Sequence, residues 1–444
     1  MKPVHVIGGG LSGCEAALQL ADRGVDVCLR EMRPVETTAA HRTGDLAEIV
    51  CSNSFKSVLL QTASGLLKEE LNLLSCRLLD IAKECAVPAG HALAVDRELF
   101  AGAVTGVVEN HPRIVVERRR QDDLDIPRPA IICTGPLTAK RLSATLAAHC
   151  TQAHLYFYDA IAPSVDAASV DTDVVYRGSR YGKGEADYLN IPLSRDDYRG
   201  LLDRIRNADT VSPHPFEEER YFESCLPIEV LAARGEDTAR FGPLRPKGLP
   251  DPRTGSEPYA VIQLRQESIS GDLLGLVGFQ TRMTYKAQSE LIRSIPGLHD
   301  AKILRFGSIH RNMFLNLPAI CRPYQQDNRL DGVYYAGQIC GVEGYVECIA
   351  SGLVAALAVF CRRSRRTIPD IPPVTMIGAL MNHIHTPPVS GTFQPMNANM
   401  GILPARTGFK GGRRERYQRA AERSIAAMKN YRDNALWLFE NVAS

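Results

Sequence analysis

The first thirty residues alternate between apolar runs and a glycine-rich turn. Residues 4–7 form a short apolar run, and after a glycine turn residues 15–21 have the spacing of an amphipathic helix. Gly24 ends that pattern, and residues 25–29 form a second apolar run. The order strand, turn, helix, strand is typical of a parallel α/β sheet.

The turn carries a phosphate-binding pattern. Gly8, Gly10 and Gly13 fit G-x-G-x-x-G, and Glu31 stands where an acid binds a ribose hydroxyl. Glycine permits a tight turn and close approach of a pyrophosphate, which rests on the helix N-terminus. Dinucleotide binding is therefore predicted. The candidate residues are Gly8, Gly9, Gly10, Leu11, Ser12, Gly13 and Glu31.

A second glycine loop occurs late in the chain. Residues 129–138 predict an apolar strand that ends in Thr-Gly-Pro, and residues 332–360 predict a strand, a glycine loop and a long helix. This loop resembles the flavin-facing segment of FAD-binding Rossmann proteins, although an ordinary buried βα unit has the same pattern. Its candidate residues are Gly337, Gln338, Gly341, Glu343 and Gly344.

The middle of the chain has another character. Two stretches within residues 259–283 alternate like half-buried strands, and residues 241–258 are rich in proline and glycine, typical of a loop. The expected fold class is α/β: an FAD-binding Rossmann-type (glutathione-reductase-like) domain with an inserted α+β domain. The expected divisions are 1–159 and 301–404 for the FAD-binding domain, 160–300 for the insertion, and 405–444 for a basic helical tail.

Composition narrows the class of protein. Of 444 residues, 45% are hydrophobic, and 52 Lys+Arg against 50 Asp+Glu leave a net charge of +2, so an RNA partner must meet a local basic patch. The twelve cysteines form no C-x-x-C pair, which favours reduced thiols and no metal. The apolar run 352–361 is too short to span a bilayer. A cytoplasmic protein without a membrane segment is expected.

Two thiols are candidates for chemistry. Cys51 precedes Ser52, Asn53 and Ser54, residues that often begin helices, and a helix N-terminus lowers the pKa of a thiol. Cys225 lies in a segment with aromatic and carboxylate residues. From the residues alone, both are more simply explained as buried packing cysteines.

Three further groups of residues suit planar or anionic ligands. His310, Arg311 and Asn312 can stack on rings and contact a heterocycle's edge, although a loop satisfying its own hydrogen bonds is an equal alternative. Residues 180–190 mix tyrosine with cations, which suits stacking and phosphate contact, although an exposed polar loop is an equal alternative. The basic runs 118–120, 362–366 and 410–419 are either phosphate contacts or solvated faces.

Taken together, the motifs resemble one known family. In order, they are "GGGLSGCEAA", "REMRP", "LAEIVCSNSFKS", "VPAGHALAVDRELF", "FESCLPIEVLAARG", "LVGFQT", "IHRNMFLN", "AGQICGVEGYVECIASG" and "FQPMNANMGILP". They are similar to those of the folate- and FAD-dependent tRNA uracil-54 methyltransferases (the TrmFO family). The resemblance extends from residue 4 to about residue 404.

The resemblance implies a reaction. A methylene passes from 5,10-methylenetetrahydrofolate to C5 of the tRNA T-loop uridine 54, FADH2 reduces it to methyl, and NADH or NADPH reloads the flavin. Cys51 and Cys225 match the family's functional cysteines. Cys225 would attack uracil C6 and Cys51 would assist the methylene or proton transfers, although these roles could be exchanged. The pterin would stack between the flavin and His310, with Arg311 and Asn312 nearby.

Three alternatives remain open from the sequence. The same chemistry could act on a ribosomal RNA uridine. A wobble-uridine modifier that uses FAD and folate shares the Rossmann glycines but is longer, with a helical tail. A non-catalytic RNA-binding flavoprotein is the third, and the two thiols and the His310 segment argue against it. A monomer or weak dimer is expected.

Overall fold

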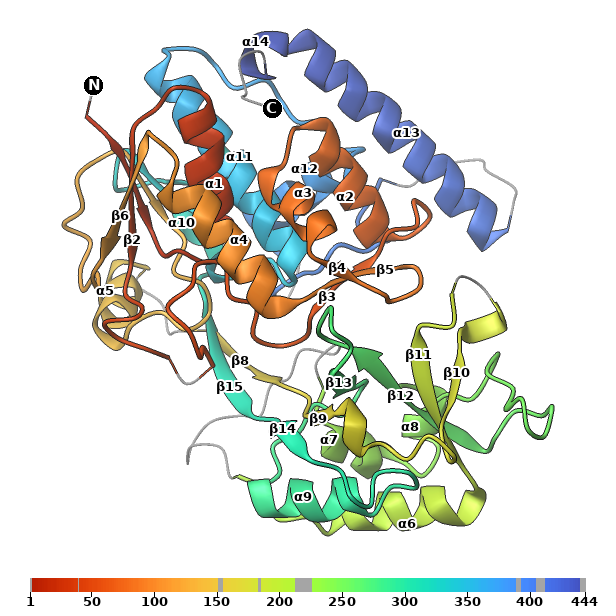
Figure 1. Ribbon diagram of the computed structural model, residues 1–444. Coiled ribbons are helices and arrows are strands. Elements are labelled where there is room, and N and C mark those ends of the chain that lie inside the picture. Colours follow the sequence, from red (N-terminus) through yellow and green to blue (C-terminus); the bar gives the residue numbers. More distant parts are fainter. Residues whose placement is uncertain are drawn as a thin grey trace.

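The computed structural model describes residues 2–38, 40–150, 155–182, 185–211, 226–388, 393–404 and 412–439. Figure 1 shows an upper part that contains both ends of the chain, a sheet and most of the helices, above a lower part with a second sheet. The predicted fold class, a Rossmann-type α/β domain with an inserted α+β domain, is confirmed by this arrangement.

The upper part is built on a seven-stranded sheet in the order β16-β17-β18-β7-β1-β2-β6. β18, β7, β1, β2 and β6 pair in parallel, and β16 and β17 form an antiparallel edge. The strands are β1 (Val4–Ile7), β2 (Val27–Glu31), β6 (Ile114–Arg118), β7 (Ala130–Ile132), β16 (Cys321–Arg322), β17 (Gln326–Asp327) and β18 (Val333–Tyr335).

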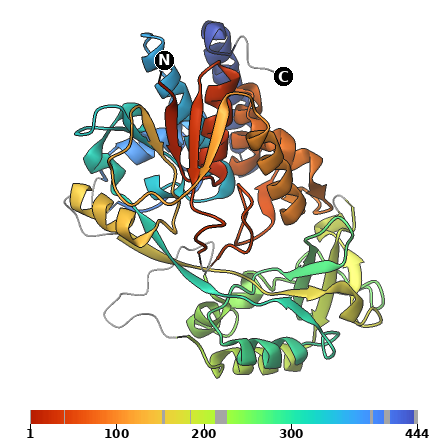
Figure 2. The ribbon, with the colours of Figure 1, turned by 60° about the vertical axis from the view of Figure 1, so that its left-hand side comes forward.

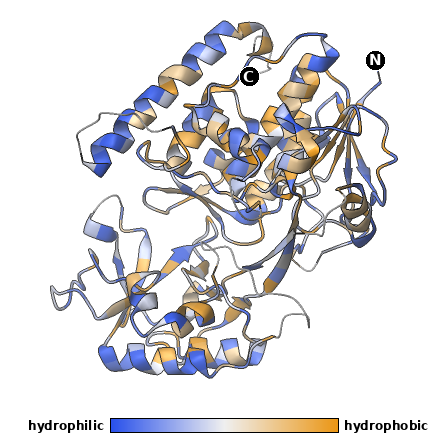
Figure 3. Cartoon of the chain, turned by 180° about the vertical axis from the view of Figure 1, so that it is seen from behind, coloured by the Kyte–Doolittle hydropathy of each residue, from blue (hydrophilic) through white to orange (hydrophobic). Residues whose placement is uncertain are grey.

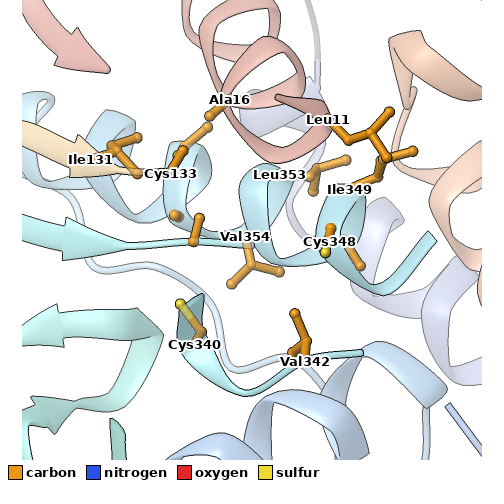
Figure 4. Packing of buried hydrophobic residues seen from close by; sticks show 14 of the residues in the cluster. Leu11, Ala16, Ile131, Cys133, Cys340, Val342, Cys348, Ile349, Leu353 and Val354 are labelled. Carbon is orange, nitrogen blue, oxygen red and sulfur yellow. The ribbon is translucent and has the colours of Figure 1, made fainter. Parts of the chain in front are cut away.

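Two helices pack together at the centre of this part. α1 (Leu11–Asp22) begins four residues earlier than the apolar pattern predicts, directly after Gly10. A Cβ on Gly352 of α11 (Tyr345–Arg363) would lie 2.2 Å from the Ser12 carbonyl oxygen, so glycine is required for this close approach. Figure 4 shows Leu11 of α1 beside Ile349 of α11, and Ala16 of α1 beside Cys133.

α11 is the long helix predicted after the second glycine loop. Its nineteen residues are apolar enough to cross a membrane by length and composition, although the apolar run 352–361 alone is too short. However, 83% of its most apolar window is buried inside the protein. α11 is therefore the central core helix of the parallel-sheet domain.

The remaining helices of the upper part cover the sheet and the central pair. They are α2 (Ala63–Leu73), α3 (Arg77–Glu84), α4 (Arg97–Glu109), α5 (Lys140–Cys150), α10 (Leu317–Ile320), α12 (Met376–His385), α13 (Arg413–Asn434) and α14 (Leu436–Phe439). α13 is the predicted basic helix, and Figure 3 shows many hydrophilic residues along it. A small sheet, β3-β5-β4, contains β3 (Ser54–Ser57), β4 (Ala86–Val87) and β5 (Ala92–Val95).

The lower part has its own antiparallel sheet and its own core, with the strand order β10-β11-β12-β13-β9-β14. Its strands are β9 (Ser164–Asp166), β10 (Tyr176–Gly178), β11 (Tyr188–Leu193), β12 (Ala260–Gln266), β13 (Leu273–Leu276) and β14 (Ile303–Arg305). Its helices are α6 (Arg195–Arg206), α7 (Ile228–Arg234), α8 (Thr238–Phe241) and α9 (Tyr285–Arg293). β12 and β13 confirm the two strands expected from alternation.

A two-stranded ribbon runs between the two parts, as Figure 2 shows. It consists of β8 (Leu155–Ala160) and β15 (Ile309–Phe314), paired antiparallel so that His310 is opposite Asp159 and Asn312 is opposite Phe157. The segment with His310 is therefore a strand and not a loop. The domain boundaries at residues 160 and 300 stay a prediction.

Candidate active site

The first glycine loop joins β1 to α1 and leaves the helix N-terminus open. Gly10 precedes α1, and no side chain caps the helix there. A Cβ on Gly10 would meet nothing within 4 Å, whereas a Cβ on Gly13 would lie 1.9 Å from the Gly8 carbonyl oxygen. Gly10 therefore faces free space, and Gly13 keeps the helix close to the strand.

Glu31, at the end of β2, is already bound within this loop. Its Oε2 accepts a hydrogen bond from the Gly9 amide at 2.7 Å, and its Oε1 accepts from the Arg33 amide at 3.0 Å and from Arg33 Nε at 2.9 Å. Arg33, only 2% exposed, also donates to Glu48 at 3.2 Å. Burial opposes ionisation of Glu31, yet Arg33 and the hydrogen bonds hold its pKa below the usual value.

Around this loop lies the first of two adjoining pockets, here named the glycine-loop pocket. Its lining includes Gly8, Gly10, Leu11, Ser12, Glu31, Arg33, His41, Glu48, Pro136, Leu137, Gln338, Tyr345 and Cys348. Burial and the charge of Arg33 lower the pKa of His41 to about 4, so its imidazole is neutral. The pocket thus combines an uncapped helix N-terminus with a fixed carboxylate.

The second cavity, here named the thiol pocket, shares Val50, Pro136, Leu137, Gln338 and Tyr345 with the first. The two pockets therefore adjoin. The thiol pocket is also lined by Ala40, Cys51, Ser52, Ser54, Lys56, Asp159, His310, Asn312, Glu343 and Gly344. Predicted residues from three distant segments of the chain thus meet in the thiol pocket.

Cys51 does not stand at a helix entrance, and that expectation is wrong. It lies in a loop, and Ser54 begins the strand β3. The Ser52 and Ser54 hydroxyls accept local bonds from the Ser54 and Lys56 amides at 3.2 and 3.1 Å. These serine-centred turns form a bend into a strand, so Cys51 does not precede a helix of its own segment.

The loop that carries Cys51 is held by side chains from three distant elements. The Tyr345 hydroxyl accepts from the Cys51 amide at 3.0 Å and from the Ser52 amide at 3.2 Å, and it donates to the Ser52 carbonyl at 3.0 Å. Arg97 of α4 and Arg305 of β14 donate to the Val50 carbonyl at 3.2 and 2.6 Å. The position of the thiol is therefore determined by the tertiary fold.

The thiol itself faces a buried carboxylate. Cys51 Sγ donates to Asp159 Oδ2 at 2.8 Å, and Asp159 is 4% exposed. His310, directly opposite Asp159 in the ribbon, has its Nε2 2.9 Å from the Ser308 hydroxyl. Burial and the charge of Arg305 lower the pKa of His310, which favours the neutral ring. A neutral imidazole in a cavity wall suits stacking on a planar ring.

The thiol pocket holds more acid than base. Burial and the neighbouring charge of Asp159 raise the pKa of Glu343 to about 8, so Glu343 keeps its proton at neutral pH. Gln338 Nε2 donates to Glu343 Oε2 at 2.7 Å. Lys56 lies 3.5 Å from Glu347, with the lysine partly exposed and the glutamate buried. The negative charge in this pocket is therefore reduced both by the proton that Glu343 keeps and by the ammonium group of Lys56.

Not every predicted residue lines the cavity. The Gly9 amide donates to Glu31. A Cβ on Gly337 would lie 2.3 Å from Ser12 Oγ, and a Cβ on Gly341 would lie 2.4 Å from the Phe393 ring. These glycines therefore shape the walls. The Arg311 side chain and Cys225 lie outside the described residues.

Four residues of the site were missed by the sequence analysis. Arg33 belongs to the quoted "REMRP" motif, and an arginine two residues after the ribose-binding acid was an available signal. Asp159, His41 and Tyr345 gave none, because their roles depend on contacts far apart in the sequence. In the described ranges, no group of three or more His, Cys, Asp or Glu could hold a metal ion.

Comparison with known proteins places this geometry in a family. Residues 3–366 match the family model described as "Glucose inhibited division protein A". A protein of Shouchella clausii named "Methylenetetrahydrofolate--tRNA-(uracil-5-)-methyltransferase TrmFO" is 47% identical over 431 residues, 97% of this chain and 98% of that protein. A protein of Syntrophotalea carbinolica with the same name is 44% identical, over 98% and 96%. The chain belongs to the TrmFO family.

The solved structure of Aquifex aeolicus GidA has the same fold. It superposes with a TM-score of 0.70 at 16% identity, covering 100% of this chain and 74% of the GidA chain. This likeness concerns the fold alone. The TrmFO relatives match this chain over nearly their whole length, whereas the GidA chain is longer.

The residues present fit an FAD molecule. The uncapped N-terminus of α1, the open side of Gly10 and the carboxylate of Glu31 suit the pyrophosphate and ribose of a dinucleotide. Gly344 precedes α11 with φ +119°, and no side chain caps that helix either. The TrmFO-family site therefore has two open helix N-termini, one at each of two adjoining pockets.

Proposed function

We propose that this protein transfers the methylene of 5,10-methylenetetrahydrofolate to C5 of the T-loop uridine of tRNA, position 54, and reduces it to methyl, giving 5-methyluridine. The observation that carries the proposal is the 44–47% identity to TrmFO proteins over nearly the whole chain. The cavity that joins Cys51 and His310 to the first glycine loop supports it further. We place the reaction in the cytoplasm.

The glycine-loop pocket would hold the cofactor. Gly8, Gly10, Leu11, Ser12 and Glu31 would bind the dinucleotide part of FAD, and Gln338 and Gly344 would border the flavin. Reduced FAD supplies the electrons that turn the transferred methylene into methyl, and NADH or NADPH would restore it. Leu11 is buried against α11, so the helix N-terminus beneath the pyrophosphate is rigid.

The thiol pocket would hold the folate and the uridine. His310, with its lowered pKa, would stack on the pterin ring, and Asn312, 3% exposed, would contact the edge of the ring together with Arg311. Uracil C5 becomes nucleophilic only after addition at C6. We assign that addition to the Cys225 thiolate and the handling of the C5 proton to Cys51. The uridine must leave its stack to enter this cavity.

The test is a methyl-transfer assay with product mapping. The FAD-loaded protein is incubated with methylenetetrahydrofolate, NADH and either unmodified tRNA or unmodified ribosomal RNA. The expected product is 5-methyluridine in the tRNA T-loop. Product in ribosomal RNA alone would keep the chemistry and replace the substrate, and no product with bound FAD would favour a non-catalytic RNA-binding flavoprotein.

Two cysteine variants sharpen this assay. Cys225→Ala should abolish transfer and retain the flavin absorbance. Cys85→Ala, a buried cysteine after α3 that lines neither pocket, should leave transfer nearly unchanged. Full turnover by the Cys225 variant would overturn the assignment of the nucleophile.

A further inference from the structure

Asp159 is the carboxylate in direct contact with the candidate thiol. Its Oδ2 accepts from Cys51 Sγ at 2.8 Å, it is 4% exposed, and it lines the thiol pocket beside His310. We propose that Asp159 is a positioning residue that orients the Cys51 thiol and accepts its proton during methyl transfer. This inference rests on the proposed function.

The ribbon holds Asp159 in a fixed place. β8 and β15 pair over six residues on each strand, with Asp159 opposite His310. The pterin-facing ring and the acceptor of the thiol proton therefore belong to one rigid unit. Because the thiol hydrogen points at Asp159, the lone pairs of the sulfur are directed elsewhere, and Cys51 also lines the cavity.

The proton transfer balances without an added reagent. The S–H bond of Cys51 breaks, its proton forms an O–H bond with Asp159, and the sulfur keeps the electron pair. That pair then takes the proton from C5 of the methylene-bearing uridine, and the C5–H electrons form the exocyclic double bond. The folate nitrogen leaves with the electrons of the carbon–nitrogen bond and takes up a proton from solvent. Cys51 is again a thiol, and Asp159 later returns its proton to solvent.

The surrounding charges decide which carboxyl faces the thiol as an anion. Glu343 keeps its proton at neutral pH because burial and the charge of Asp159 raise its pKa to about 8. Cys51 donates its hydrogen bond to Asp159 Oδ2, so Asp159 is the member of this pair that is placed to accept the thiol proton. The other charged or titratable groups around Cys51 and Asp159 are Lys56 on β3, Arg97 on α4, Arg305 on β14, His310 on β15, and Tyr345 and Glu347 on α11.

The experiment compares Asp159→Asn with wild type by two readouts. Alkylation of Cys51 by iodoacetamide is followed against pH in the FAD-loaded holoenzyme, with peptide mass spectrometry reading Cys51 alone. Removing an anion beside the thiol should move the half-maximal pH down by about one unit, so alkylation at neutral pH becomes about tenfold faster. Methyl transfer should fall about 100-fold. If Asp159 only supported the fold, its substitution would not make alkylation faster and methyl transfer slower at the same time.

Control variants make the result decisive. Asp173→Asn, the same substitution at an exposed position, should change neither readout. Asp159→Glu should keep the wild-type alkylation profile within about half a unit and regain part of the methyl transfer, because it keeps the charge. An unchanged half-maximal pH in Asp159→Asn, or unchanged methyl transfer, would overturn the proposal.

Two further comparisons separate folding and functional failures. If Asp159→Asn loses its flavin, the alkylation of Cys51 is compared between the folded wild-type holoenzyme and wild type unfolded in urea. Cys51 should require a higher pH for alkylation in the folded holoenzyme. An equal or lower pH would overturn the proposal. The alkylation profile needs no RNA or folate. Failure of wild type to methylate RNA is therefore a failure of the proposed function and is read separately.

Discussion

The two pockets of the cavity are neighbours but differ in how their charges are balanced. In the glycine-loop pocket, the carboxylates of Glu31 and Glu48 share the buried guanidinium of Arg33, at 2.9 and 3.2 Å. In the thiol pocket, Asp159 and Glu343 lie together, and the partly exposed Lys56 contacts Glu347 instead. In the glycine-loop pocket, the guanidinium of Arg33 reduces the negative charge. In the thiol pocket, the proton that Glu343 keeps does so.

This difference matches what each pocket would do. A dinucleotide site must present the same hydrogen-bonding groups in every turnover, and a permanently charged arginine provides that constancy. A site that moves protons needs groups that titrate near neutral pH, which buried neighbouring carboxyls provide. This contrast predicts that removing a fixed charge destabilises the glycine-loop pocket, whereas the protonation of the thiol pocket changes with pH.

The largest effect is expected from Arg33→Met, which would remove the positive charge that balances the carboxylates of the glycine-loop pocket. Removing one partner of a buried ion pair costs about 3–5 kcal/mol, and here two carboxylates lose their cation. Urea unfolding measures it. The matched control is Arg113→Met, which breaks an exposed pair with Asp26 and should change stability by no more than about 1 kcal/mol.

The Arg33 effect should also depend on pH in a defined direction. Arg33 helps to hold the pKa of Glu31 below its unfolded value, so the stability it provides is present above that value and is lost as pH falls through the folded pKa. The difference between wild type and Arg33→Met should therefore be larger at pH 7 than at pH 4. An equal loss at both pH values would contradict the charge-balance explanation.

A somewhat smaller effect is expected from Gly13→Ala, which tests the backbone of the same pocket. The added Cβ would lie 1.9 Å from the Gly8 carbonyl, so strand and helix must separate, at a cost of about 3 kcal/mol. Bound FAD, measured by flavin absorbance after gel filtration, should fall strongly. Gly102→Ala in α4 meets nothing within 4 Å and should keep all its flavin. Similar flavin content in both variants would contradict this account of the loop.

The two pockets also differ in how far the sequence could predict them. The glycine loop, α1 and Glu31 all fall within thirty residues, so local spacing was enough to place them together. The thiol pocket joins Cys51, Asp159, His310 and Glu343, and the partner of the thiol is 108 residues away. Only the family resemblance brought Cys51 and His310 into one proposal.

One local inference failed for a physical reason that sequence cannot resolve. Ser52, Asn53 and Ser54 suit a helix start and also suit a bend into a strand, because their side chains bond to nearby backbone in either case. Tertiary contacts select the strand: Asn53 donates to the Val95 carbonyl of β5 at 3.0 Å and to the Gln266 carbonyl of β12 at 3.1 Å. Such contacts are not visible in a single sequence.

An intermediate effect is expected from Glu343→Gln, which removes a titrating group from the thiol pocket. The pKa of Glu343 is raised to about 8, so its contribution to stability is full below the unfolded value near 4.5 and is lost as pH rises toward 8. The glutamine variant should match wild type near pH 4.5 and exceed its stability at pH 8.5. Parallel stability curves would show that Glu343 is not protonated in the folded protein.

The smallest effect is expected from Tyr345→Phe, which keeps the charges of both pockets and loosens only the wall between them. The variant loses the hydroxyl that contacts the Cys51 and Ser52 amides and the Ser52 carbonyl, whereas its ring still packs on Phe55 at 5.6 Å. One hydroxyl of this kind contributes about 1–2 kcal/mol, or roughly tenfold in a rate that depends on the loop.

Methyl transfer by Tyr345→Phe should therefore fall about tenfold, while bound flavin is retained. The matched control is Tyr285→Phe, at an exposed ring that stacks on Phe306, and it should be silent. If Tyr345→Phe lost flavin as readily as Gly13→Ala, the Tyr345 hydroxyl would be needed for the glycine-loop pocket to hold the flavin. Unequal loss, with transfer reduced and flavin kept, would show that the two pockets are joined in space but held by separate contacts.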